Sequence, residues 1–419
     1  MALDPTSSRP ADAIEVWANS GAMSITGRAG GPPLGPPAPL VDRLTVVAEA
    51  LRARSAELGN EVSIAPIELL GERAAIAGLT RNGSTSCGGA TRLLPVADGW
   101  VAVSLARSDD IDLVPAWLGT VADPADPWAA VSEAVCDQSA AVVVDRACGL
   151  GLAVAALPVA PATVPARCSG PLPHHAHRIG PAPRAAVLGD LVVADLSSLW
   201  AGPLCGSLLA DAGAEVWKIE STQRPDGARR GAAGFFDLLN AGKRSVAVDF
   251  TTSAGRRHLC ALVEHADIVI ESSRVRALEQ LGLDARDLLE HGRPRAWISI
   301  TAHGRMPPGR DRVGFGDDAA GAGGLVAWDG DEPCFCADAV ADPTTGLVAA
   351  AACLDALAAG GSWLVDVAMA SVAAHLAGPT LPAPAGLVAA PPVARPTRGV
   401  APPLGSDTAP VLATLPAAP

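Results

Sequence analysis

Residues 190–220, DLVVADLSSLWAGPLCGSLLADAGAEVWKIE, contain the pattern that best predicts the fold. It begins with an apolar run, LVVADL, continues with the helix-compatible PLCGSLLADAG, and ends with a second Val- and Ile-containing run, AEVWKI. Pro203 suits the first turn of a helix and Gly213 suits its C-terminal cap, so both helix ends are marked. A strand, a helix and a second strand, with both strands apolar, are typical of a parallel βαβ unit.

The same alternation continues along the chain to residue 368. Four more Val- and Ile-rich runs are predicted to be strands, at residues 245–250, 266–271, 295–300 and 363–368. Further helices are predicted at residues 253–266, 275–282 and 343–360. The sequence therefore predicts an α/β fold, with a doubly wound, largely parallel sheet in residues 185–378 and a smaller α+β domain.

This predicted sheet lacks the glycine-rich loops that bind nucleotides. The first strand is followed by SSLWAGPLCG rather than GxGxxG, and no GxxxxGK[ST] is present. The sequence therefore gives no support for NAD or ATP as a ligand.

The rest of the chain is divided by Pro-rich segments. Residues 1–156 are interpreted as the smaller α+β domain, including a helix at 41–58. Residues 157–184 are predicted to be an interdomain linker, and residues 379–419 a second Pro-rich connection with a tail. A weak internal repeat relates residues 20–51 to residues 322–357 and places Asp42 and Asp342 at matching positions.

Composition excludes several classes of function. The 419 residues carry a formal net charge of −13, whereas a nucleic-acid interface needs a basic face. The N-terminus lacks a basic stretch followed by an apolar one, and the two long uncharged stretches contain prolines, so neither a signal peptide nor a membrane span is expected. The nine cysteines lack metal-ligand spacing and are expected to be reduced thiols, which favours a cytoplasmic protein.

Four segments of the sheet region resemble the class III CoA-transferases, the group that contains formyl-CoA transferase, carnitine CoA-transferase and α-methylacyl-CoA racemase. They are residues 190–220, 238–272, 277–304 and 313–325, in the order of the family. The patterns AGP-x9-GAEV-x-K-x-E and N-x-GKRS-x4-F carry the resemblance, and residues 401–412 look like the family's C-terminal end. In the family the small domain follows the sheet, whereas a similar segment precedes it here, so the domain order is rearranged.

The resemblance implies an acyl-CoA:carboxylate CoA-transferase that works through an aspartate nucleophile, a mixed anhydride and an enzyme-bound CoA thioester. Asp342, in VADPTTGL, matches the position of that nucleophile. An Asp before Pro-Thr-Thr is also a good helix N-cap, and the two roles are compatible. Asp42, its counterpart in the repeat, is interpreted as a remnant of a worn copy.

The same resemblance implies a site for CoA or acyl-CoA, expected as a substrate rather than as a permanently bound cofactor. Its expected contacts are Ser198, Trp200, Ala201, Lys243, Arg244 and Val248. Trp200 is predicted either to pack on the adenine or to fill the core. Lys243 and Arg244 are either cations for the phosphate groups or a solvated pair on a turn.

Two alternative functions stay open. One is a non-catalytic acyl-CoA-binding or subunit-type homologue, and the other is an acyl-CoA isomerase or racemase on the same fold. Racemisation is disfavoured because Phe315 occupies the position of the racemase His, and His303 lies elsewhere. The expected partners are acyl-CoA and carboxylic acids, not nucleic acid or membrane. A homodimer, or a heteromer with a related chain, is also expected, because the long linker lets the small domain reach either sheet.

Two clusters of ionisable residues are interpreted as structural. His174, His175 and His177 lie in the Pro-rich segment, so a flexible loop is predicted there rather than a metal site. Asp317 and Asp318 are predicted to be a solvated helix start. No metal site is expected.

Overall fold

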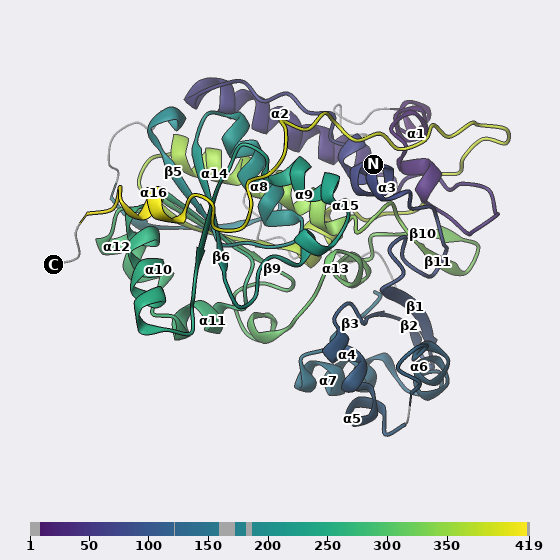
Figure 1. The fold of residues 1–419 in the computed structure, drawn as a ribbon. Helices are drawn as coiled ribbons and strands as arrows, with labels where there is room; N and C mark the ends of the chain where they lie inside the picture. The colour runs from purple at the N-terminus through teal and green to yellow at the C-terminus, as the bar shows by residue number, and fades with distance from the viewer. Residues whose placement is uncertain (1–8, 121, 159–171, 182–186, 417–419) are drawn as a thin grey trace.

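A seven-stranded sheet forms the centre of the computed structural model, which describes residues 9–120, 122–158, 172–181 and 187–416 (Figure 1). The strand order is β4-β12-β9-β8-β5-β6-β7. Parallel pairing joins β5 (Val192–Asp195), β6 (Glu215–Ser221), β7 (Arg244–Val248), β8 (Ile268–Glu271), β9 (Ala296–Thr301) and β12 (Ser362–Ala368). Each of these strands matches a predicted one, and the predicted α/β fold with a largely parallel sheet is confirmed.

Helices cover both faces of this sheet. α8 (Ala201–Asp211) and α14 (Ala341–Ala358) share one core with one face, and α10 (Ser253–His265), α11 (Val275–Gln280) and α12 (Ala285–His291) share a second core with the other. Along β8, Ile268 and Ile270 lie in the first core and Val269 lies in the second. Strands that are apolar on both faces therefore produce the two helical layers.

The edge of the sheet differs from the sequence prediction. β4 (His175–Gly180) pairs antiparallel with β12, where a flexible linker and a flexible loop at His174, His175 and His177 were predicted. Backbone pairing with β12 needs no apolar side chains, and four of the six residues of β4 are exposed, so hydropathy carried no signal of a strand. Residues 159–171 and 182–184 of the predicted linker lie outside the described residues.

The N-terminal helices pack with the large sheet. α1 (Pro10–Asn19), α2 (Leu40–Leu58) and α3 (Glu72–Ala77) contribute to the core that contains α8 and α14. α2 lies along α14, where Arg54 Nε contacts Asp355 Oδ1 at 2.7 Å. Residues 1–156 were predicted to form one smaller domain, whereas the N-terminal helices α1 to α3 pack on the large sheet instead. Helical periodicity shows that one face of a helix is buried, but not which element covers that face.

The smaller α+β unit has an antiparallel sheet of β1 (Thr91–Val96), β2 (Gly99–Ser104) and β3 (Ala153–Ala156). It is covered by α4 (Ser108–Asp112), α5 (Val114–Leu118), α6 (Trp128–Val135) and α7 (Ala140–Leu150). This sheet packs on α13 (Gly316–Gly323) and on the hairpin of β10 (Val326–Asp329) and β11 (Glu332–Phe335) (Figure 1). Leu93, Ala102 and Phe335 share a core at this contact, which attaches the small unit to the large domain.

The C-terminal residues follow an extended path across the molecule (Figure 1). After α15 (Met369–Leu376), Ala390 N–H donates to Ala18 O at 2.8 Å, so the path runs beside the N-terminal segment. It ends at α16 (Thr408–Leu412), where Asp407 N–H donates to Ser245 O of β7 at 2.9 Å. Within the part of the chain described, no helix combines the length and the apolar character that crossing a membrane requires.

Two buried ion pairs support the start of α8. Lys243 Nζ contacts Asp195 Oδ2 at 2.8 Å, and Lys218 Nζ contacts Asp226 Oδ2 at 3.0 Å, with every side chain at most 2% exposed. Lys243 also donates to Pro203 O at 2.8 Å, which ties it to the first turn of α8. Burial alone would raise the pKa of Asp195, but Lys243 and Lys218 outweigh it and lower the pKa to about 2.

Replacing Lys243 with Met should destabilise the protein strongly, because it leaves Asp195 buried with only the more distant Lys218 as a cation. Loss of one partner of a buried pair costs about 3–5 kcal/mol. Arg244→Met is the matched control, since Arg244 pairs with Glu215 at 3.0 Å on the surface, where a pair contributes about 0–1 kcal/mol. Urea unfolding of both variants measures the difference, and equal small losses would show that the Lys243 pair is not a structural support.

Candidate active site

A cleft opens at the carboxyl edge of the parallel strands, where ligands bind in α/β folds of this type. Residues that directly follow or end the strands line it, namely Ser198 after β5, Ser272 and Ser273 after β8, Thr301 and Ala302 at β9, and Met369 after β12. The small unit contributes Arg107 to the same lining. Asp342 also lies in it, so the predicted nucleophile faces a cleft that both units form.

Asp342 stands where three helices begin. It is the second residue of α14, and its carboxylate lies beside the first residue of α8, Ala201, and the first residue of α13, Gly316, whose backbone N–H groups lower its pKa. Helix N-termini carry partial positive charge, so the arrangement stabilises an anion. A Cβ at position 316 would lie 2.6 Å from Ala339 O and 2.9 Å from Asp342 Cγ, so this close approach requires glycine.

The surroundings raise the pKa of Asp342 to about 6. Burial is the main cause and Asp338 adds to it, while Arg73 and the two N–H groups act in the opposite direction. Because an exposed aspartate has a pKa of about 3.9, Asp342 changes charge much closer to neutral pH than an ordinary carboxyl group does.

Unfavourable backbone conformations lie next to Asp342. Among the described residues other than glycine, a positive φ occurs at Leu199 (69°), Ala337 (56°) and Ala339 (44°). Leu199 lies two residues before Ala201, and Ala337 and Ala339 belong to the turn that precedes α14. Strained residues persist only where the surrounding contacts hold them, and they often mark functional sites.

The strained loop before α8 is held by the buried pair of Lys218 and Asp226. Leu199 N–H donates to Asp226 Oδ1 at 3.0 Å, and Lys218 donates to the carbonyl oxygen of Ser197. The pair therefore fixes both sides of the turn at Leu199. This contact explains how the loop keeps the shape that points Ala201 N–H at Asp342.

Asp317 and Asp318 are buried, which differs from the predicted solvated helix start. Strand β2 of the small unit packs over α13 and excludes water from this end of the helix. Asp318 Oδ1 accepts the Phe315 N–H at 2.8 Å and so caps the first turn of α13. Burial raises the pKa of each carboxyl group to about 7, and Asp338 contributes to the rise at Asp317.

Arginines gather in the cleft although the chain as a whole is acidic. The lining includes Arg107, Arg224, Arg274, Arg310 and Arg312. Arg107 contacts Asp110 at 2.5 Å and Arg310 contacts Glu279 at 3.3 Å. Arg224 and Arg274 are exposed and have no carboxylate within ion-pair distance among the described residues, so both are free to bind an anionic ligand.

Three of the predicted site residues meet in the cleft, namely Ser198, Ala201 and Asp342. The other predicted CoA contacts lie elsewhere: Trp200, Lys243 and Val248 are at most 5% exposed, and Arg244 pairs with Glu215 outside the cleft lining. The side chain of Trp200 packs edge-to-face on Phe235 at 5.0 Å, so the core-filling alternative describes it. A sequence pattern identifies the loop but not the direction in which each side chain points.

Three other residues were considered from the sequence, namely Phe315, Asp42 and His303. Phe315 lines the cleft, whereas Asp42 lies in the first turn of α2, outside the lining. His303 is also outside the lining, and burial together with Arg312 lowers its pKa to about 3.

The cleft arginines were not predicted from the sequence. Arg224 and Arg274 follow β6 and β8 by three residues, and ligands of α/β folds bind at the carboxyl ends of the strands, so their positions could have indicated them.

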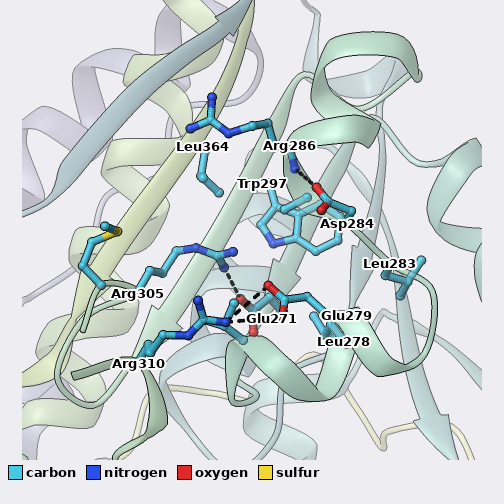
Figure 2. A pocket seen from close by; sticks show the side chains of 13 residues that line it. Glu271, Leu278, Glu279, Leu283, Asp284, Arg286, Trp297, Arg305, Arg310 and Leu364 are labelled. Carbon is cyan, nitrogen blue, oxygen red and sulfur yellow. Dashed lines mark hydrogen bonds and ion pairs between the residues drawn. The ribbon is translucent and has the colours of Figure 1, made fainter. Parts of the chain in front are cut away.

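A second hollow adjoins the cleft at α11 (Figure 2). Arg305 points into it and pairs with the buried Glu271 at 3.0 Å. Arg310 lines both hollows and pairs with Glu279, which lines only the second one. This ion pair therefore stands at the border between the two.

Residues 188–405 match the sequence profile of CoA-transferase family III. The matched region is more than half of the chain, and the chain belongs to this family. The family resemblance and the fold class expected from the sequence are thereby confirmed.

Curated relatives match part of the chain. An acyl-CoA transferase of Fusarium pseudograminearum is 32% identical over 191 residues, which is 41% of this chain and 42% of that protein. A succinyl-CoA–D-citramalate CoA-transferase of Chloroflexus aurantiacus is 35% identical over 147 residues, 33% of this chain and 37% of that protein. A succinate–glutarate CoA-transferase of Agrobacterium fabrum is 30% identical over 209 residues, 45% of this chain and 52% of that protein. The chain thus spans about half the length of these relatives, or less.

Among solved structures, a CaiB/BaiF family protein from Brucella suis is 32% identical to this chain, with a TM-score of 0.41. The match covers 46% of this chain and 55% of that one.

Gly316→Ala should displace the Asp342 carboxylate and destabilise the protein by about 1–3 kcal/mol, because the new methyl group overlaps Asp342 and Ala339. Gly149→Ala is the control, since Gly149 lies in α7 and a Cβ there meets nothing within 4 Å. Chemical unfolding compares the two variants. Unchanged stability in Gly316→Ala would mean that the convergence of helices around Asp342 is looser than described.

Proposed function

We propose that this protein is an acyl-CoA:carboxylate CoA-transferase in which Asp342 is the nucleophile. The observation that carries the proposal is the position of Asp342, whose carboxylate lies in a cleft lined by arginines and beside the N-termini of two other helices, α8 and α13. Membership of CoA-transferase family III supports the same reaction class.

The proposed reaction begins when a carboxylate oxygen of Asp342 attacks the thioester carbonyl of an acyl-CoA. The C–S bond breaks, CoA leaves as thiolate, and a mixed anhydride forms. The thiolate then attacks the Asp342 carbonyl of the anhydride, releases the donor acid and leaves a CoA thioester on Asp342. The acceptor carboxylate repeats these steps in reverse, takes the CoA and regenerates Asp342.

The N–H groups of Ala201 and Gly316 suit this sequence of steps. They stabilise the carboxylate before attack, and they lie beside the Asp342 oxygen that becomes negative when the CoA thiolate attacks the Asp342 carbonyl of the anhydride. The reaction needs Asp342 ionised, so the proposed activity rises with pH through about 6, the pKa of this residue in its buried acidic cluster.

The substrates are proposed from the chemistry of the cleft. Arg224 and Arg274 are at the surface and unpaired among the described residues, which suits the phosphate groups of CoA. Relatives named for succinyl-CoA and for D-citramalate or glutarate suggest succinyl-CoA as donor and small dicarboxylic acids as acceptors in a first assay. The expected homodimer, or heteromer with a related chain, stays a prediction.

Asp342→Asn should abolish CoA transfer from succinyl-CoA to D-citramalate or glutarate, with a loss on the order of 10³-fold or more, because an amide is a poor nucleophile. Its stability should change little, since Asn has the same shape and keeps a carbonyl oxygen beside the N–H groups of Ala201 and Gly316. In the wild type, hydroxylamine should trap the activated carboxyl as a hydroxamate on Asp342, located by peptide mass spectrometry.

The internal repeat offers the control Asp42→Asn, which should keep full activity because Asp42 lies outside the cleft lining. Full activity in Asp342→Asn would exclude the proposed nucleophile. CoA binding without any trapped hydroxamate in the wild type would favour the non-catalytic acyl-CoA-binding alternative instead.

CoA binding should depend on Arg224 and Arg274. Replacing either with Ala should weaken CoA binding roughly fivefold, about 1 kcal/mol, and reduce its sensitivity to salt, because a phosphate contact is removed. Arg244→Ala should bind like the wild type, since Arg244 pairs with Glu215 away from the cleft. Isothermal titration with CoA at two salt concentrations makes the comparison, and an equal loss in Arg244→Ala would place the phosphates at β7 instead.

A further inference from the structure

Arg73 forms an ion pair with the turn that leads to Asp342. It belongs to α3, outside the segment that matches the family, and its guanidinium makes two contacts with Asp338, Nε to Oδ2 at 2.8 Å and Nη2 to Oδ1 at 2.5 Å. Asp338 is fully buried. A two-pronged contact of this kind fixes the orientation of the carboxylate as well as its distance.

The turn that Arg73 holds is strained on both sides of Asp338. Ala337 and Ala339 both have a left-handed backbone conformation. This conformation is unfavourable for any residue other than glycine, because the Cβ atom crowds the backbone. Other parts of the N-terminal segment hold the same turn, since Ala337 N–H donates to Thr26 Oγ1 at 2.9 Å. The conformation of residues 337–339 is therefore maintained by contacts from residues that precede the sheet, among them Thr26, Arg73 and Cys87.

This turn directly positions Asp342. Asp342 N–H donates to Ala339 O at 2.8 Å, so the backbone of the strained turn and the start of α14 are joined. Ala339 O also lies where a Cβ on Gly316 would be crowded, which leaves little space for the turn to move. A shift of the turn would therefore move Asp342 relative to the N–H groups of Ala201 and Gly316.

Arg73 also balances the charge of the acidic cluster. Asp317 from α13, Asp338 from the turn and Asp342 from α14 all interact electrostatically with Arg73, while α8 contributes the Ala201 N–H. The guanidinium lies 5.3 Å from the ring centroid of Trp200, the residue before Ala201. Arg107 and Arg312, the other cations close to this end of α13, engage Asp110 and the carbonyl of Val154.

We propose that Arg73 is a positioning residue for Asp342, holding the strained turn before α14 and supplying the positive charge that keeps Asp342 ionised. The inference rests on the proposed function, in which Asp342 is the nucleophile. It makes the N-terminal segment, which lies outside the family match, part of the catalytic apparatus. Arg73 touches the turn and not the substrate, so it acts through Asp342.

The test compares the pH dependence of CoA transfer from succinyl-CoA in Arg73→Met, Arg73→Lys and Arg54→Met. Removing the cation should move the acidic limb of the Arg73→Met profile about one to three pH units higher, because a neighbouring arginine lowers a carboxyl pKa by that amount. Arg73→Lys keeps the charge but not the two-pronged contact, so its limb should stay in place while kcat falls at least about tenfold. Arg54→Met is the matched control, because Arg54 also joins an N-terminal helix to an aspartate of α14, at Asp355, away from the cleft.

The outcomes separate this inference from the proposed function. Activity in Asp342→Asn would overturn the proposed nucleophile and the role of Arg73 with it. An inactive Asp342→Asn together with wild-type pH profiles and kcat in both Arg73 variants would overturn the role of Arg73 alone. If Arg73→Met does not fold, Arg73→Lys decides, and an unchanged kcat in that variant would reject the inference.

Discussion

Carboxylates removed from water govern the arrangement around the cleft, because a buried charge is tolerated only where cations or N–H groups surround it. Asp195 meets Lys243 and Asp338 meets Arg73, while Asp342, which is partly exposed in the cleft, lies beside the first N–H groups of α8 and α13. In each case the partner comes from another element of the fold. Satisfying these charges therefore holds strands, helix starts and the N-terminal segment in one arrangement.

The same contacts hold the backbone where it is least favourable. Leu199 and the turn of Ala337 to Ala339 adopt left-handed conformations, each at a cost of about 1–3 kcal/mol. One strained segment is fixed through Lys218 and Asp226, the other through Arg73. The loop at Leu199 leads to Ala201, and the turn of Ala337 to Ala339 leads to the start of α14, so both lie beside Asp342. These ion pairs therefore help to determine the geometry of the site as well as the stability of the sheet.

The cleft is shared between the segment that matches the family and the residues that precede it. The sheet and α14 supply Asp342 and the strand ends, whereas the small unit supplies Arg107 and covers α13, which leaves Asp317 and Asp318 buried. The N-terminal helices cover α14 and carry Arg73. The residues before the sheet thus contribute to the cleft although they lie outside the segment that matches the family.

The parallel strands, the helices between them and the family could be predicted from the sequence alone, because strand and helix periodicities and the AGP and GKRS patterns are local. Ser198, Ala201 and Asp342, which the sequence proposes as site residues, lie together in the lining of one cleft. The sequence did not distinguish Lys243, which is buried beside Asp195, from its neighbour Arg244, which is on the surface, and it did not reveal the strand at 175–180, whose exposed side chains carry no hydropathy signal. The fold in three dimensions was needed to show which charges are buried, which arginines enter the cleft and that Arg73 reaches the turn before Asp342. Arg73 and Asp338 are 265 positions apart, and a local pattern specifies which face is buried but not what covers it.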